Sequence, residues 1–265
     1  MFRKTGLYIF VISTMILFTG CNEYQRVLKS TDLEYKYDKA LEYYENGEYN
    51  YSFGLFDELR TLYQGTMRVR DVYYYYSSSL YHLEDYILAG YHFKTFAQTF
   101  PRHEKAEEAA FLAAKCYYLE APKYSLDQSY TYKAMNELQL FINTHSGSIF
   151  IPECNEMVDE LRAKLERKSF EIAHQYYHTQ RYQAAVVSFN NTLNDFPDTP
   201  YREEAMYYRM VSAFKLAENS VLDKQQARFR EARTAYLDFI RAYPESEFRE
   251  DADDVNQDIE EFLNG

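Results

Sequence analysis

The sequence is poor in the residues that build catalytic loops and covalent cross-links. It has no tryptophan, 8 glycines, 6 prolines and 3 cysteines among 265 residues. Because so few glycines leave little material for loops that cradle phosphate groups, nucleotide chemistry is not expected. No Walker loop, dinucleotide fingerprint, nucleophile elbow or zinc-binding pair of cysteines occurs in the sequence. The sequence therefore predicts a protein that is not an enzyme and that uses no cofactor or metal.

Basic residues are also in deficit. The chain has 29 Lys and Arg against 41 Asp and Glu, a formal net charge of −12. Removal of residues 1–20 would take away two basic residues and no acidic one, which changes the net charge to −14. Binding to phosphate backbones needs a basic surface, so no nucleic-acid partner is expected. The same charge disfavours adsorption of the folded surface to anionic lipid.

Residues 1–20 have the pattern of a targeting segment, with a basic start and an apolar run at Gly6–Phe18. The run is shorter than the ~20 apolar residues of a membrane-spanning helix. The small residues before Cys21 resemble the lipobox of bacterial lipoproteins, in which the cysteine is lipidated and becomes the mature N-terminus. Phe18 stands where that motif usually has leucine. An uncleaved N-terminal anchor is the alternative, and both would tether the chain to a membrane.

A helix–turn–helix pattern recurs along the rest of the chain. Its clearest copy is Ala173–Pro197, with a turn at Gln180-Arg181 and a second helix that ends at the proline. Its second helix has a small residue, an apolar residue four positions later, and an aromatic–Pro pair eleven and twelve positions later. The small residues of the five copies are Ser52, Ala89, Ala134, Ala185 and Ala232.

The intervals between these small residues are 37, 45, 51 and 47 positions. A tetratricopeptide unit has a period of ~34 residues, so the longer intervals imply lengthened helices and loops. The sequence predicts an all-α fold, an α-solenoid of about five tetratricopeptide-like helical hairpins. A C-terminal capping helix is expected at Glu247–Leu263, because a solenoid must close its last hydrophobic face.

The pattern also predicts how the chain is divided. We expect a signal peptide at residues 1–20 and a tether at 21–30. An N-terminal half with repeats one to three is expected at 31–146, and a C-terminal half with repeats four and five and the capping helix at 153–265. The boundary falls where helical signal is poorest, and a long helix at Glu153–Thr179 follows it. The other hairpin helices are expected at 33–46, 49–63, 72–83, 86–99, 105–119, 129–144, 202–218 and 227–242.

Tyrosine is abundant, with 29 copies. Several recur at related positions of the first helix of each hairpin, which lines the concave surface of a tetratricopeptide array. Two interpretations remain open: the rings line a peptide-binding groove, or they fill gaps between neighbouring helices. The candidate groove residues are Tyr37, Tyr44, Tyr74, Tyr81, Tyr117 and Tyr177.

Two further sets of residues bear on metal binding and on cross-linking. His174 and His178 lie four apart on one helix, but no third ligand accompanies them, so no metal site is predicted. Cys116 and Cys154 could form a disulfide in an oxidising compartment, although free buried thiols that act as small hydrophobic side chains are favoured.

Taken in order, these features resemble the BamD family of outer-membrane assembly lipoproteins. The resemblance is carried by the lipobox, the five hairpins, the long helix, and the motifs Tyr176-Tyr177…Tyr182-Gln-Ala-Ala185, Phe196-Pro197-Asp-Thr and Glu203-Glu-Ala205. It covers essentially the whole mature chain. The third repeat departs from it, because His145-Ser146 replaces the aromatic–Pro ending.

The resemblance implies a non-enzymatic, lipid-anchored scaffold of the β-barrel assembly machinery on the periplasmic face of the outer membrane. In that family the C-terminal repeats bind the barrel subunit BamA, and the N-terminal repeats are thought to receive the C-terminal strand of unfolded client barrels. A BamA-like barrel protein and unfolded outer-membrane proteins are the partners it implies here. Two alternatives are a tetratricopeptide lipoprotein that coordinates envelope or cell-wall processes and a carbohydrate-binding lipoprotein that stacks sugars on tyrosines.

Overall fold

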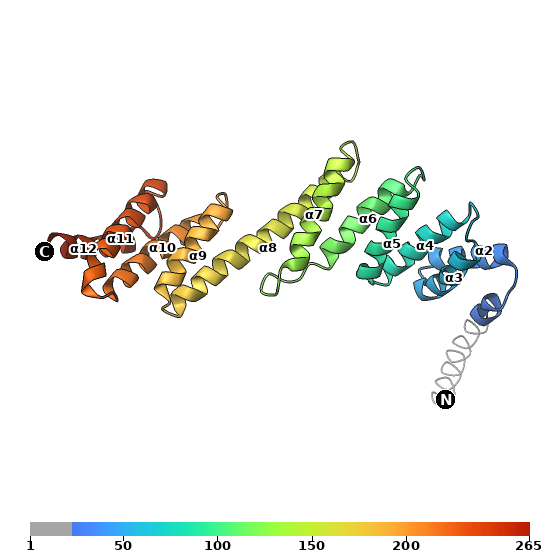
Figure 1. Ribbon diagram of the computed structural model, residues 1–265, viewed down its shortest axis with the longest axis horizontal. Coiled ribbons are helices and arrows are strands. Elements are labelled where there is room, and N and C mark those ends of the chain that lie inside the picture. Colours follow the sequence, from blue (N-terminus) through green and yellow to red (C-terminus); the bar gives the residue numbers. More distant parts are fainter. Residues whose placement is uncertain (1–22) are drawn as a thin grey trace, which may run out of the picture. The chain divides into compact units, whose positions relative to one another are not determined.

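The computed structural model describes residues 23–265, so the leader segment and Cys21 lie outside the described residues. All regular secondary structure in the described part of the chain is helical (Figure 1). The helices are α2 (Leu33–Glu45), α3 (Tyr49–Leu62), α4 (Val69–His82), α5 (Tyr86–Thr99), α6 (Ala106–Leu119), α7 (Ser129–Thr144), α8 (Ile151–His178), α9 (Tyr182–Asp195), α10 (Arg202–Glu218), α11 (Leu222–Ala242) and α12 (Arg249–Asn264).

The helices form consecutive hairpins, α2–α3, α4–α5, α6–α7, α8–α9 and α10–α11, followed by α12. This order confirms the predicted tetratricopeptide-like solenoid. The small residue that defines each repeat is fully buried, because the second helix of the hairpin presses there against its neighbours. These residues are Ser52, Ala89, Ala134, Ala185 and Ala232, each 0% exposed.

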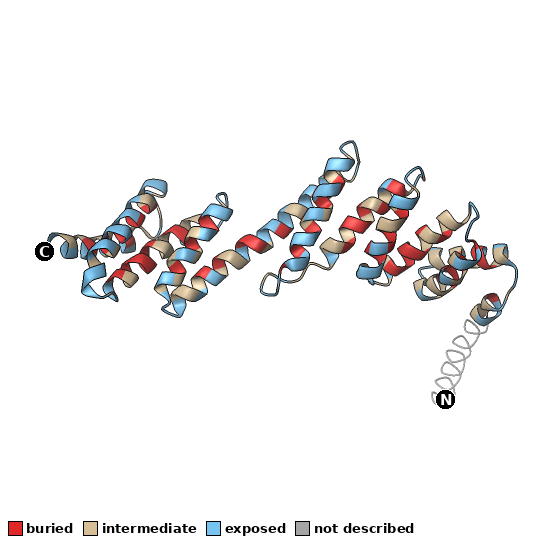
Figure 2. Cartoon of the chain, viewed as in Figure 1, coloured by how far each residue is buried: buried red, intermediate tan, exposed pale blue. Residues whose placement is uncertain are grey.

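The chain divides into two compact units. Unit 1 comprises the described residues up to Ala121 together with Ser129–Val158, and unit 2 comprises Pro122–Gln128 and Asp159–Gly265. Each has its own core: Phe56, Phe93 and Phe96 are among the fully buried side chains of unit 1, and Phe189, Met210 and Phe239 among those of unit 2. Within each unit the buried residues lie on the sides of the helices that face a neighbouring helix (Figure 2).

Three hairpin turns share one backbone geometry. Gly47, Glu84 and Gln180 have φ angles of 76°, 62° and 58°, the left-handed region, two residues after the helices α2, α4 and α8. At each, the left-handed residue and the one after it donate backbone hydrogen bonds back into the helix, as Glu84 does to Tyr81 O and Asp85 to Leu80 O at 3.0 Å. This is the Schellman arrangement, which satisfies the last carbonyl groups of a helix.

Two helix starts differ from the predicted ones by three residues or more. Helix α4 begins at Val69 where Val72 was expected, and α11 begins at Leu222 where Ala227 was expected. The residue before α11, Val221, is extended, with φ −65° and ψ 149°. The helix starts directly after it because the residues that follow are good helix formers. A charged, polar sequence was misread as a loop there.

The segment expected as a tether is helical over residues 23–28. Val27 is fully buried in the core of unit 1, and the ring of Tyr24 lies 4.6 Å from that of Tyr51. An ion pair of 3.1 Å joins Glu23 to Lys39 on α2. This segment is therefore packed against α2 and α3.

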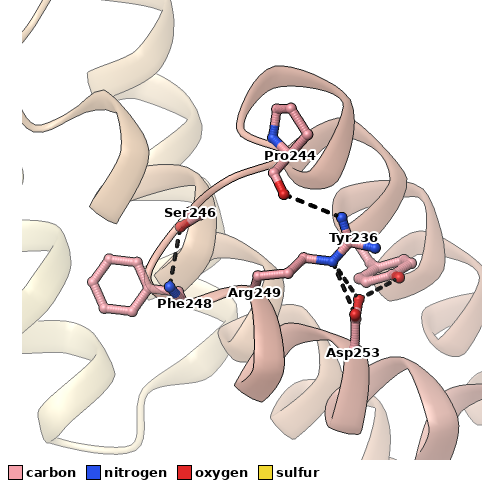
Figure 3. A network of polar contacts seen from close by, with 6 residues as sticks. All are labelled: Tyr236, Pro244, Ser246, Phe248, Arg249 and Asp253. Carbon is pink, nitrogen blue, oxygen red and sulfur yellow. Dashed lines mark hydrogen bonds and ion pairs between the residues drawn. The ribbon is translucent and has the colours of Figure 1, made fainter.

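Helix α12 closes the array as the predicted capping helix, with Ala252 and Ile259 fully buried. A polar network joins it to α11 (Figure 3): the Tyr236 hydroxyl donates to Asp253 Oδ1 at 2.7 Å, and Arg249 Nε donates to the same carboxylate at 2.8 and 2.9 Å. These two donors lower the pKa of the Asp253 carboxyl, with the tyrosine contributing most.

Candidate functional site

Pairs of tyrosines stand on the three left-handed hairpin turns. In each pair one tyrosine lies near the end of the first helix and the other opens the second helix five residues later. The ring centroids are 5.5 Å apart for Tyr44 and Tyr49, 5.6 Å for Tyr81 and Tyr86, and 6.3 Å for Tyr177 and Tyr182. The first tyrosine of each pair also supplies the carbonyl oxygen that accepts a hydrogen bond from the left-handed residue. The turn geometry therefore sets the position of both rings.

The first two pairs meet in unit 1 through His82, the last residue of α4. The imidazole of His82 stacks on Tyr49 with ring centroids 4.2 Å apart and an interplanar angle of 7°. It also lies 5.6 Å from Tyr81 and 5.7 Å from Tyr44. We call Tyr44, Tyr49, Tyr81, Tyr86 and His82 the aromatic turn cluster.

The aromatic turn cluster is partly accessible and uncharged. All four of its tyrosines are half-buried, and His82 is exposed. The Tyr44 hydroxyl is anchored to Ser78 Oγ at 2.7 Å, so its ring is held in one orientation. Burial raises the pKa of Tyr44 and Tyr81, while it lowers the pKa of His82. At neutral pH the cluster thus offers apolar ring faces with polar tips.

Two of the six candidate groove tyrosines belong to the core instead. Tyr37 is 5% exposed, its ring meets Phe56 edge to face at 5.9 Å, and the Arg68 guanidinium lies 4.5 Å above it. Tyr74 is 6% exposed and packs edge to face on Phe93 at 5.9 Å. Burial raises the pKa of Tyr37 to about 12 and also raises that of Tyr74. These two rings fill space between helices and cannot line a groove.

Tyr117 is not a member of the aromatic turn cluster, although it lies next to Tyr86 of that cluster. It is half-buried and borders a small pocket of about 180 Å³ together with Tyr86 and Tyr130. Since α4 and α6 both span 14 residues, the α6 position that corresponds to Tyr81 is Tyr118, one residue further on.

Tyr177 belongs to unit 2, where it is half-buried against Tyr208 at 5.0 Å. His174 packs edge to face on the same Tyr208 ring at 4.6 Å. The His174 and His178 rings are 4.3 Å apart. In the described part of the chain, no group of three or more His, Cys, Asp or Glu side chains is arranged to hold a metal ion.

Cys116 and Cys154 are both buried free thiols. The sequence left a disulfide and free thiols as alternatives, and the structure has the free thiols. Burial raises the pKa of Cys116 to about 12 and that of Cys154 to about 11. Among residues 23–265, no helix combines the length and apolar character needed to cross a bilayer.

The sequence contains a signal for the tyrosine pairs. Their second members are Tyr49, Tyr86 and Tyr182, each five residues after the first member. The spacing of five residues across a turn, Tyr-x4-Tyr, marks two rings that the hairpin brings together. His82 gave no signal, because its stacking partner lies on another hairpin.

Comparison with known proteins places these features in a family. The model of the family YfiO, described as outer membrane lipoprotein, matches residues 30–226. A curated protein of Aquifex aeolicus (strain VF5), named "Putative outer membrane protein assembly factor BamD", is 24% identical over 209 residues, which cover 78% of this chain and 68% of that protein.

Proposed function

Because the chain belongs to the YfiO family of outer membrane lipoproteins, we propose that it is a lipid-anchored scaffold for the assembly of outer-membrane proteins. Unit 1 binds segments of unfolded outer-membrane proteins at the aromatic turn cluster. Unit 2 carries the surface that docks on a BamA-like barrel protein. Acyl chains on Cys21 hold the scaffold on the periplasmic face of the outer membrane, and more than one chain gives stable attachment.

The observation that carries this proposal is the arrangement of Tyr44, Tyr49, Tyr81 and Tyr86. Four half-buried rings lie together at the ends of two neighbouring hairpins, oriented by the turns and by the bond from Tyr44 to Ser78. Rigid tyrosines bind peptides at a low entropic cost, because the rings contact apolar side chains and the hydroxyl groups bond to the main chain. A client segment that ends in an aromatic residue supplies both kinds of partner.

Unit 2 has a surface suited to a folded partner. A shallow cleft of about 670 Å³ opens beside the α8–α9 turn, bordered by Tyr176, Arg181, Tyr182 and Val187. Val187 is 54% exposed on α9 although it is apolar. An exposed apolar side chain next to tyrosine and arginine has the composition of a protein interface.

The peptide-binding role is tested by titrating the full-length protein in detergent with a fluorescent peptide that ends in phenylalanine. Changing both Tyr44 and Tyr81 to alanine should weaken binding by about tenfold or more, since aromatic anchors supply most of the affinity of such contacts. Tyr132→Ala is the matched control, because Tyr132 is a 57% exposed tyrosine of α7 outside the cluster.

Unchanged affinity in the Tyr44→Ala, Tyr81→Ala double variant, with a circular dichroism spectrum like that of the parent protein, would exclude the aromatic turn cluster as the peptide site. Equal losses in the double variant and in Tyr132→Ala would show that tyrosine content, and not the position of the rings, decides the binding.

A further inference from the structure

A second candidate site lies elsewhere in unit 1, over helix α6 and between α5 and α7. It is a cleft of about 600 Å³. Its floor is made of three alanines of α6, Ala106, Ala110 and Ala113, and its walls include Lys94 of α5 and Leu140 of α7. These three helices follow one another in the array (Figure 1). None of the residues of the aromatic turn cluster borders this cleft.

The preceding hairpin shows what normally fills such a space. Helices α4 and α6 both have 14 residues and similar burial patterns, with Val72 and Ala109 fully buried at the fourth position. By this alignment Ala110 corresponds to Tyr73 and Ala113 to Tyr76. The second repeat thus has two tyrosine rings at the positions where α6 has only alanine methyl groups.

Those two rings close the gap between α3 and α5. Tyr76 stacks on Phe53 of α3 at 5.3 Å and meets His92 of α5 edge to face at 4.9 Å. The Tyr73 hydroxyl is hydrogen-bonded to Nδ1 of the same His92 at 2.8 Å. Arg60 of α3 lies 4.4 Å above the Tyr76 ring. Neighbouring hairpins are thus held together here by aromatic rings and one hydroxyl bond.

Over α6 the partners of those rings have changed as well. Counting from the small reference residues Ala89 and Ala134, Glu137 on α7 corresponds to His92 on α5. Its carboxylate borders the cleft, and Lys94 Nζ lies 2.6 Å from Glu137 Oε1. A carboxylate accepts hydrogen bonds only, so this wall offers an acceptor to a hydroxyl group in the place of the Tyr73 hydroxyl.

We propose that this cleft binds a segment of a partner protein that carries two aromatic side chains, at least one of them tyrosine, spaced like Tyr73 and Tyr76. The partner supplies from outside the two rings that the third repeat lacks. One ring covers Ala110 and directs its hydroxyl group to Glu137, and the other covers Ala113. The two alanines that stand where α4 has tyrosines border a cleft of about 600 Å³, and a preformed concave site of this kind is what a binding segment requires.

The test uses three short peptides, acetyl-Tyr-Ala-Ala-Tyr-amide and its Phe-Ala-Ala-Phe and Leu-Ala-Ala-Leu analogues. They are titrated into full-length protein with labelled alanine methyl groups, and the NMR signals of Ala106, Ala110 and Ala113 are followed. The tyrosine peptide should give a saturable shift of these signals and bind about tenfold more tightly than the leucine peptide. The phenylalanine peptide should fall between them.

Two variants separate the parts of the proposal. Ala110→Tyr fills the cleft from within, as Tyr73 does in the second repeat, and should abolish the shift of Ala113. Glu137→Leu keeps a side chain of similar size on the wall but removes the hydrogen-bond acceptor, and should reduce the affinity for the tyrosine peptide to about that for the phenylalanine peptide. Gln139→Tyr is the control, since Gln139 is exposed on α7 outside the cleft.

Equal affinity for all three peptides, or no saturable shift at Ala110 and Ala113 in the parent protein, would overturn the proposal. Retention of the tyrosine preference in Glu137→Leu would overturn the assignment of the acceptor. Because the aromatic turn cluster is unchanged in these variants, their binding to the phenylalanine-terminated peptide should be unaffected, and the two sites are tested independently.

Discussion

The thiols of Cys116 and Cys154 lie inside unit 1, where burial disfavours the charged thiolate. With pKa values raised to about 12 and about 11, almost no thiolate exists at pH 8. We expect neither cysteine to react with iodoacetamide over one hour in the native protein and both to react in 6 M guanidinium chloride. Mass spectrometry of the digested protein measures both. Rapid alkylation of native Cys116 would contradict its burial.

Two histidines of unit 1, the buried His92 and the partly covered His82, should make stability depend on pH. Burial lowers the pKa of His82 and of His92, so the folded state binds fewer protons there than the unfolded state. Above about pH 6.5, the ordinary pKa of histidine, both side chains are neutral in the folded and unfolded states and the free energy of unfolding is not reduced. It falls as the pH is lowered from there through the folded-state pKa. The urea midpoint should therefore be lower at pH 5.5 than at pH 7.5.

The substitutions His82→Gln and His92→Gln together should make the urea midpoint less dependent on pH over this range. If the parent protein and the double variant lost the same stability between pH 7.5 and 5.5, the two histidines would not be the cause.

Single tyrosines show where sequence reasoning reached its limit. Helical spacing placed Tyr37 and Tyr44 on one stripe, two turns apart, and gave no means of telling them apart. Tyr37 lies where Phe56 of α3 and Arg68 cover it, whereas Tyr44 stands beside the turn, where the chain leaves the helix and exposes the ring. The exposure of each ring depends on the side chains that cover it. These come from other parts of the fold and cannot be read from the spacing along one helix.

At the scale of helices and turns, two of the three left-handed positions are occupied by residues other than glycine. Glu84 and Gln180 adopt φ angles of 62° and 58°, where a side chain costs about 1–2 kcal/mol. Replacing each by glycine should stabilise the protein by about 0.5–1 kcal/mol, because part of that gain is lost to the greater freedom of glycine in the unfolded chain. Urea denaturation measures the change.

Gly47, at the same position of the first turn, is the matched control. A Cβ added there would meet no atom within 4 Å, so Gly47→Ala should destabilise the protein through its backbone alone, by about 1 kcal/mol. Destabilisation by Glu84→Gly would mean that the Glu84 side chain makes a contribution larger than the backbone strain.

The hairpins themselves were predictable because their signal is local. Apolar periodicity and the small residue fixed both α5 and α7 to the residue, and Pro101 marked the end of α5. The start of α11 was not, since its polar first turn has neither a periodic apolar residue nor a capping side chain. The cleft over α6 was not predictable from the sequence either. Its alanines are visible there, but only the alignment of α6 with α4 in the structure shows that they stand where α4 has tyrosines.

For the whole molecule, the anchor and the scaffold should be separable. We expect Cys21→Ser to move the protein from the membrane fraction to the soluble fraction, because the helices of residues 23–265 include none suited to spanning a bilayer. Immunoblotting of fractionated cells measures this. The circular dichroism spectrum of the folded part should stay unchanged. If Cys21→Ser remained membrane-bound after a high-salt wash, the uncleaved-anchor alternative would be favoured.

The central claim is that this chain is part of a machine that assembles outer-membrane proteins. Purifying the tagged, full-length protein from detergent-solubilised outer membrane, and identifying by mass spectrometry what accompanies it, tests this most directly. The account predicts that a large β-barrel protein is recovered in roughly equal molar amount, and that an exposed-face change in unit 2 such as Val187→Glu reduces the recovery. Elution of the chain alone, or its recovery from the inner membrane, would contradict the account.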